Sequence, residues 1–183
     1  LPYNVRMTIS PRRPATFTVA LRVPGWCRAA RLSVNGKPVN VKAVTRKGYA
    51  RILRRWERGD RIELVLPMPV ERVVAHPKAR QVCGRAALMR GPVVYCLEQA
   101  DNGPELNDIR LPRNAALSCK LERRLFGGAT VVNGTALRRA TAGWTNALYG
   151  AKSPRYVKTR ITAIPYCLWA NREPGEMLVW IRE

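Results

Sequence analysis

Residues Arg85–Glu98 read RAALMRGPVVYCLE, and this stretch decides how the rest of the chain is interpreted. Beyond the Gly91-Pro92 break, both alternating faces of an extended strand are apolar, with Val93, Tyr95 and Leu97 on one and Val94 and Cys96 on the other. Such a strand is expected to be buried on both sides. Because alternating segments precede and follow it, we expect it to join two packed β units. It holds neither a nucleophile-base pair nor a metal-ligand spacing, which indicates a scaffold rather than a catalytic centre.

The segments before this stretch show strand alternation. Thr16–Val23 alternates strictly and stops at Pro24-Gly25, so it predicts a half-buried strand. We expect Trp26, which follows, to pack into the core at the end of the sheet. The alternative is that its indole stacks on a sugar. Asn35-Gly36 predicts a tight hairpin, since both residues tolerate the positive φ angles that it needs.

A second predicted hairpin pairs Tyr49–Trp56 with Arg61–Met68. Pro67 and Pro69 end this pairing, because proline cannot donate a hydrogen bond to a ladder. We place the domain boundary near Ala79, which gives a first β-sandwich over residues 1–79 and a second over residues 80–183.

The longest irregular segment is Thr141–Lys158, which contains Trp144 and Tyr149 among Gly, Ser, Asn and Pro. Loops that carry aromatic residues are frequent binding sites, so both are candidates for carbohydrate contact. The alternative is that they anchor the loop on the sandwich. A final hairpin is predicted from Thr159–Asn171 and Glu176–Arg182, with both strands largely buried.

No segment has a sustained helical period, and short strands alternate with Gly and Pro turns. The sequence therefore predicts an all-β fold of two packed antiparallel β-sandwich units, jelly-roll-like in type.

The charge is strongly positive: 33 Lys and Arg oppose 12 Asp and Glu, a net charge of +21. Such a surface attracts polyanions. The arginines are nevertheless scattered along alternating strands, with no basic tract and no aromatic-basic recognition motif. We therefore do not expect specific nucleic-acid binding, and interpret these arginines as solvated or facing a partner.

Five cysteines are spaced too widely for a CxxC motif, and His76 is the sole histidine. We expect neither a disulfide framework nor a local zinc site. Free thiols favour a reducing compartment such as the cytoplasm. No apolar run is long enough for a membrane span, and no signal peptide is recognised. Because the chain opens at Leu1 and enters a strand almost at once, it is interpreted as a piece of a longer protein.

Five stretches together resemble the C-terminal part of glycoside hydrolase family 127, the β-L-arabinofuranosidase-like enzymes. They are Leu21–Cys27 (LRVPGWC), Val34–Gly36 (VNG), Gly59-Asp60 with Leu64–Pro69, Arg90–Glu98 (RGPVVYCLE), and Thr162–Tyr166 with Trp169–Arg172 and Gly175–Met177. They follow one another across nearly the whole chain.

The resemblance implies a helical (α/α)6 barrel that carries catalysis, followed by flanking β-sandwich domains that help to form a dimer in some members. It also implies a cysteine thiolate nucleophile, activated by a zinc ion that cysteines and a glutamate hold. All of these residues belong to the barrel. No catalytic or metal-binding residue is therefore expected in this chain, and zinc is expected only in the barrel.

The leading hypothesis is a non-catalytic β-sandwich region that supports such a barrel, forms part of a homodimer, or both. Tyr95 and Glu98 are candidates for the contact between domains. The chain alone is not expected to hydrolyse arabinofuranosyl linkages. Two alternatives stay open: a module that binds arabinose-containing glycans through Trp144 and Tyr149, and a basic polyanion-binding domain.

Overall fold

A computed structural model describes residues 3–142 and 148–183. Strands make up 51% of it and helices 10%, which confirms the predicted mostly-β class with packed antiparallel sheets. The chain divides into two compact units, Leu1–Pro69 and Val70–Glu183. Within the described ranges, no helix has the length and apolar character needed to cross a membrane.

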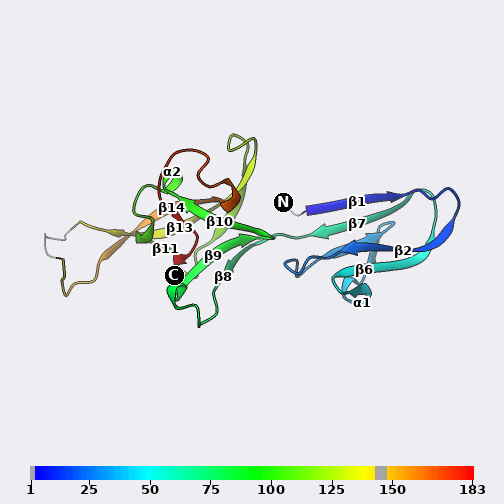
Figure 1. The fold of residues 1–183 in the computed structure, drawn as a ribbon, viewed down its shortest axis with the longest axis horizontal. Coiled ribbons are helices and arrows are strands. Elements are labelled where there is room, and N and C mark those ends of the chain that lie inside the picture. The colour runs from blue at the N-terminus through cyan, green and yellow to red at the C-terminus, as the bar shows by residue number, and fades with distance from the viewer. Residues whose placement is uncertain (1–2, 143–147) are drawn as a thin grey trace. The chain divides into compact units, whose positions relative to one another are not determined.

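The first unit is a sandwich of two antiparallel sheets (Figure 1). One has the strand order β1 (Tyr3–Ile9), β7 (Asp60–Leu66), β3 (Arg31–Val34) and β4 (Lys37–Val39). The other has the order β2 (Ala15–Arg22), β6 (Tyr49–Trp56) and β5 (Thr45–Arg46), and α1 (Val41–Val44) connects the two sheets.

Alternation along the strands creates the core of this sandwich. The inward residues of both sheets meet in one cluster, which includes Leu21, Leu32, Ala50, Trp56, Ile62 and Leu64. The Trp56 side chain is fully buried, and its Nε1–H donates to the carbonyl oxygen of Phe17 at 2.9 Å. The predicted Asn35-Gly36 turn is confirmed, with φ angles of 49° and 76°. The predicted hairpin of Tyr49–Trp56 with Arg61–Met68 is wrong: β6 pairs with β2 and β5, whereas β7 pairs with β1 and β3 in the other sheet, so the turn between β6 and β7 carries the chain from one sheet to the other.

The division between the units falls after Pro69, earlier in the chain than the boundary expected near Ala79. The reason is β8 (Val70–Val73), which pairs antiparallel with β9 (Arg85–Arg90) and so belongs with the second unit. The turn between these strands includes the 3-10 helix η1 (Arg80–Val82).

The second unit is built on a sheet whose hydrogen-bonded order closes on itself. From β9 the order runs through β10 (Val93–Glu98), β14 (Arg155–Pro165), β13 (Ala129–Ala140), β11 (Ile109–Arg110) and β16 (Ile181–Arg182), and β16 pairs with β9 again. β15 (Met177–Leu178) pairs with β10, and β12 (Leu117–Glu122) pairs with β13. Closure encloses an apolar interior that includes Leu88, Tyr95, Leu97, Ile109, Val132, Ile161 and Ile181.

The central stretch is buried as predicted, and it forms the β9–β10 hairpin around Gly91, whose φ is 58°. It does not join the two units, because both of its strands lie within the second unit. The expectation of a join was therefore wrong. Burial on both faces arises because one face lines the closed interior, whereas Cys96 on the other face belongs to a cluster covered by Leu125, Leu168, Met177 and Val179.

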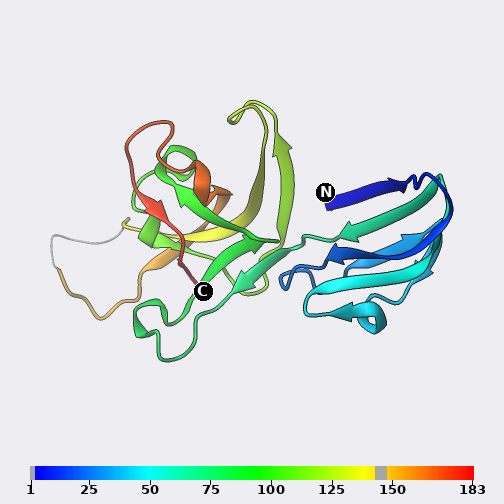
Figure 2. The same cartoon turned by 45° about the vertical axis from the view of Figure 1, so that its right-hand side comes forward.

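Figure 2 shows β12 and the start of β13 as a hairpin that extends from the rest of the second unit. The predicted final hairpin is wrong. β14 pairs with β13 and β10, whereas the last two strands pair elsewhere, β15 with β10 and β16 with β9 and β11. Alternation marked these segments as extended, but their pairing partners lie far away in the sequence. The remaining short helices are α2 (Gln99–Asn102), η2 (Leu106–Asp108) and η3 (Tyr166–Leu168).

Candidate functional site

The aromatic residues proposed for carbohydrate contact belong to different parts of the chain. Trp26 is partly buried against the core of the first unit. Tyr149 belongs to the second unit, and 90% of it is exposed. Trp144 lies outside the described residues. A carbohydrate contact through any of them stays a prediction.

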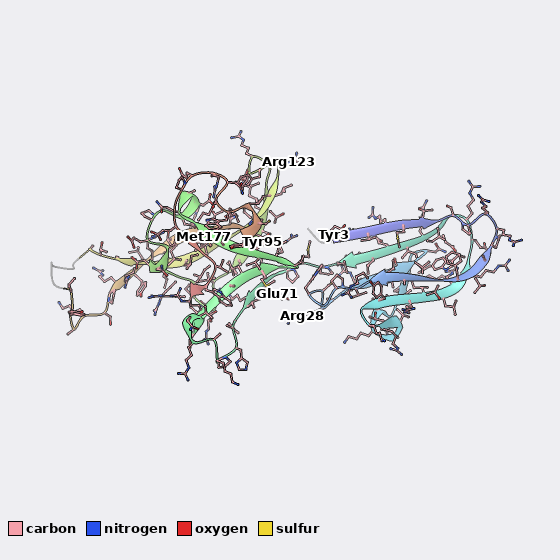
Figure 3. The ribbon with its side chains drawn as sticks, viewed as in Figure 1. Tyr3, Arg28, Glu71, Tyr95, Arg123 and Met177 are labelled. Atoms are coloured by element: carbon pink, nitrogen blue, oxygen red, sulfur yellow. The ribbon has the colours of Figure 1, made fainter. Side chains whose placement is uncertain are left out.

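The two candidates for a contact between domains are both buried at β10. Tyr95 is 2% exposed and packs in the closed interior of the second unit. Glu98 is 5% exposed and ends the strand on the opposite face (Figure 3 labels Tyr95, together with Met177 on the neighbouring β15). Their role in a contact between domains stays a prediction. Glu98 does form hydrogen bonds with the chain that follows β14.

The buried carboxylate of Glu98 is the centre of an ion cluster whose other members are partly exposed. One of its carboxylate oxygens accepts hydrogen bonds from the Arg172 Nε and Nη2 groups, the first at 3.2 Å. The other accepts the Ala170 backbone N–H at 2.9 Å. Arg172 also forms two bonds with Asp101, from Nη1 to Oδ1 at 2.8 Å and from Nη2 to Oδ2 at 2.6 Å. One planar guanidinium thus neutralises two carboxylates, which is the geometry that arginine supports best.

The sequence after β10 creates this cluster locally. The short helix α2 begins directly after Glu98 and places Asp101 beside it. The Asn102 side chain then extends the pairing towards β14: it donates to the carbonyl oxygens of Glu98 and Thr162, both at 2.9 Å, and accepts the Thr162 N–H at 2.9 Å. The segment after β10 is therefore fixed to the sheet on one side and to Arg172 on the other.

A second set of bonds fixes the chain that leads into β15. The Glu176 carboxylate accepts the backbone N–H groups of Glu105 at 3.0 Å and Leu106 at 2.8 Å. Gln99 and Glu176 exchange two more bonds, at 3.0 and 3.1 Å. A Cβ atom added to Gly175 would lie only 3.0 Å from the Gln99 Cβ, so glycine permits this close approach.

These contacts hold an exposed aromatic pair in place. Tyr166 and Trp169 stack with ring centroids 6.1 Å apart and an interplanar angle of 19°. They are 44% and 39% exposed. The next residue, Ala170, has a φ of 61°, an unfavourable conformation for a residue with a Cβ, and its N–H points at Glu98. The Glu98–Arg172 cluster thus stabilises a strained turn that carries two exposed rings.

The titratable groups close to this turn have raised pKa values. Burial, assisted by the charge of Glu98, raises the pKa of the Cys96 thiol to about 12. Burial also raises the pKa of Tyr95. The hydrogen bonds that Arg172 donates to Asp101 and Glu98 raise its pKa. A thiol held protonated is a poor nucleophile and a poor metal ligand, whereas stacked exposed rings form a flat apolar patch that protein or sugar can cover.

The described residues do not fit the zinc site that the family resemblance implies for the barrel. In residues 3–142 and 148–183, no group of three or more His, Cys, Asp or Glu side chains is placed to hold a metal ion. Cys27 and Cys96 are buried in different units, and Cys83, Cys119 and Cys167 are exposed. No step of catalysis is assigned to them.

Sequence reasoning missed Tyr166, Trp169 and Arg172 as functional candidates. It assigned Tyr166 and Trp169 to a long buried strand that was predicted to reach Asn171, and placed Arg172 just beyond it, whereas β14 ends at Pro165 and η3 begins at the next residue. A signal was present in the spacing: two aromatic residues three positions apart, directly before Ala-Asn-Arg, do not fit a period of two.

Comparison with protein families accounts for both units. Residues 2–68 match the model described as "Beta-L-arabinofuranosidase, GH127 middle domain". Residues 70–182 match the model described as "Glycoside hydrolase family 127 C-terminal domain". The chain belongs to glycoside hydrolase family 127. Glu98, Arg172 and Glu176 all lie within the stretches on which the resemblance to this family rested.

Relatives of this family 127 chain extend well beyond it. It is 35% identical, over 98% of its length, to a non-reducing end β-L-arabinofuranosidase of Bifidobacterium longum subsp. longum, and covers 28% of that protein. It matches a crystal structure of a family 127 β-L-arabinofuranosidase from Geobacillus stearothermophilus T6 with a TM-score of 0.95 and 47% identity, over 98% of this chain and 28% of the other. A family 127 β-arabinofuranosidase structure matches with a TM-score of 0.83 and 30% identity, over 98% and 29%.

Proposed function

We propose that this chain is a non-catalytic β region of a β-L-arabinofuranosidase, and that it supports a separate catalytic barrel by packing against it through Tyr166 and Trp169. The observation that carries the proposal is the exposed stacked pair, held on a strained turn by the Glu98–Arg172 cluster. Neighbouring exposed aromatic rings form an apolar patch of the kind that marks contact surfaces.

Membership of family 127 supports the catalytic context. The family resemblance assigns reaction chemistry to a barrel, and this chain covers 28% of its Bifidobacterium relative. The Cys96 thiol, which is buried and held protonated, cannot replace the nucleophile of such a barrel. Direct contact with arabinose-containing glycans, and dimer formation, stay predictions.

A chimera tests the proposal. Replacing the matching region of the Geobacillus stearothermophilus enzyme with this chain is feasible because the two are 47% identical with a TM-score of 0.95. We expect the chimera to hydrolyse an aryl β-L-arabinofuranoside and the 183-residue chain alone to be inactive. Hydrolysis by the chain alone would overturn the non-catalytic role.

The contact itself is tested by Tyr166→Ala with Trp169→Ala in the chimera. We expect the catalytic part to lose thermal stability and to exchange backbone amide hydrogens faster where it meets the chain. Leu148→Ala with Tyr149→Ala is the matched control, because these side chains are 86% and 90% exposed. If the two double variants behave alike, the aromatic pair is not the contact.

A further inference from the structure

The outward face of the three-stranded sheet in the first unit is strongly basic. Alternation along β2 and β6 and their register place every second residue on this face, and β5 adds one more. We call it the arginine face; its residues are Thr16, Thr18, Ala20, Arg22, Arg46, Tyr49, Arg51, Leu53 and Arg55, and all are exposed. In Figures 1 and 2, β2 and β6 lie side by side.

No acidic side chain belongs to this face. The acidic residues of the first unit are Glu57, Asp60 and Glu63, which occupy the β6–β7 turn and β7. Among the described residues, the side chains of Arg51 and Arg55 have no hydrogen-bond or ion-pair partner. Their charges are therefore available to an outside anion.

One end of the arginine face is preorganised. Arg22 Nη1 donates to the carbonyl oxygens of Gly48 at 2.8 Å and Val23 at 3.1 Å, which places the guanidinium over the Tyr49 ring, 5.4 Å from its centroid. A Cβ atom at residue 48 would lie 1.9 Å from that nitrogen, so Gly48 makes room for it. Behind the sheet, Val19, Leu21, Ala50 and Ile52 pack into the core, which keeps the face rigid.

The chemistry of the face selects its ligand. Arginine binds carboxylates through two parallel hydrogen bonds, and the neighbouring threonine hydroxyls can pair with sugar hydroxyls. Arg51 and Arg55 are four residues apart on one strand, a separation of about 13 Å, which suits repeated charges along a polymer. Single-stranded nucleic acid would require open aromatic faces for base stacking, and the Tyr49 ring on this face already carries Arg22.

We propose that the arginine face binds a carboxylate-bearing polysaccharide. The choice of a glycan over other polyanions rests on the proposed function, because the named relatives act on arabinofuranosides. The face then retains an acidic polymer near an enzyme that cleaves its sugar substituents.

The test uses the 183-residue chain and polygalacturonate as the probe, with binding measured by affinity electrophoresis at low salt. Arg51→Glu with Arg55→Glu is expected to weaken retention about tenfold or more, since two attractive pairs become repulsive. The matched control is Arg123→Glu with Arg124→Glu, which changes the net charge equally at the β12–β13 turn of the other unit (Figure 3). Equal losses in both variants would overturn the proposal, as would a lack of binding by the parent chain.

Two further measurements distinguish a specific carboxylate site from unspecific charge attraction and from a nucleic-acid site. Arg51→Lys with Arg55→Lys keeps the charge and removes the forked donor, so retention should still fall; unchanged retention would indicate unspecific attraction and overturn the site. Stronger binding to single-stranded DNA than to polygalacturonate at the same salt would assign the face to nucleic acid instead. Each variant is first checked for an unchanged circular dichroism spectrum.

The chimera distinguishes failure of this inference from failure of the proposed function. Hydrolysis of a small uncharged arabinofuranoside should be unaffected by Arg51→Glu with Arg55→Glu, whereas polygalacturonate retention by the chimera should fall. If the parent chimera is active but does not bind polygalacturonate, the proposed function stands. The inference about the arginine face is then overturned, because this face does not bind the polymer in the chimera.

Discussion

The two units of this chain are stabilised in different ways. The first is a sandwich whose sheets meet through one apolar cluster, centred on the buried Trp56. The second closes its sheet around an apolar interior and adds polar side chains that fix loops to strands. Besides the Glu98 cluster, Arg72 donates to the carbonyl oxygens of Leu111, Pro112 and Ala115, and it pairs with Glu183 at 3.3 Å.

The difference follows from connectivity. The connections between successive strands of the first unit are short, although β1 pairs with β7 and β2 with β6 across long separations in the sequence. The second unit pairs distant segments and carries longer connections, whose backbone groups need partners. The side chains of Glu98, Asn102 and Glu176 provide some of those partners.

The largest expected effect is the loss of the core anchor of the first unit. Trp56→Ala removes a fully buried ring and its hydrogen bond to Phe17, so the free energy of unfolding should fall by about 3–5 kcal/mol. Hydrogen exchange resolves the two units separately, and residues 70–183 should keep their protection. Tyr49→Ala, at a position 43% exposed, is the control. Equal loss of protection in both units would show that they unfold as one.

Removing the centre of the polar cluster should cost somewhat less. Glu98→Ala leaves Arg172 and the Ala170 N–H without their partner, and because the Arg172 side chain is 25% exposed we expect a loss of about 3 kcal/mol in the second unit. Chemical denaturation followed by hydrogen exchange measures it. Glu122→Ala is the control, since its pair with Lys120 is exposed at 39% and 70%. A loss no greater than in this control would mean that the cluster does not stabilise the turn.

Alkaline pH should destabilise the second unit, by less than Trp56→Ala or Glu98→Ala does in its own unit. Burial raises the pKa of Cys96 from 9.0 to about 12, so the unfolded state releases its proton first. The contribution of Cys96 to the free energy of unfolding is therefore complete below about pH 9 and is lost as the pH rises towards 12. The loss reaches about 1–2 kcal/mol by pH ~10.5.

Cys96→Ala should reduce this decline between pH 8 and pH 10.5, although it lowers stability throughout by removing core volume. The measurement is the stability of the second unit at both pH values. Cys27→Ala, in the other unit, controls for the loss of a buried thiol. An unchanged pH dependence in Cys96→Ala would assign the alkaline sensitivity to other groups.

The smallest effect is expected at an exposed pair of the first unit. Arg6 Nε and Glu63 Oε1 are 3.0 Å apart, but their side chains are 78% and 41% exposed. Glu63→Gln should cost less than about 1 kcal/mol, and added salt should shrink the difference. Denaturation at two salt concentrations measures it. A cost equal to that of Glu98→Ala would remove the contrast between exposed and buried ion pairs.

The sequence predicted the fold better in the first unit than in the second. Strict alternation in Thr16–Val23 and the Asn35-Gly36 turn correctly located β2 and the β3–β4 hairpin. The hairpin predicted from Tyr49–Trp56 and Arg61–Met68 was wrong, because a tight turn can also carry the chain from one sheet to the other. In the second unit, the burial of Arg85–Glu98 was predicted, but its place was not, because a pattern of apolar residues does not specify which distant strand will cover it. Glu98 was noticed as a possible contact, yet its partner Arg172 lies 74 positions away. No local pattern predicts such a pairing, since its energy depends on burial that only the folded chain provides.

Closure of the second sheet also bears on the order of events during synthesis. β16 is made after every other strand of its unit, yet it sits between β9 and β11 in the closed order. The ribosome must therefore release Ile181 and Arg182 before that ring of strands can be completed. All strands of the first unit have been made once Pro69 is synthesised, so this unit can begin to fold while the rest is still being translated. Until its last strand arrives, the second unit holds two unpaired strand edges side by side, which makes this interval the period of greatest exposure to aggregation.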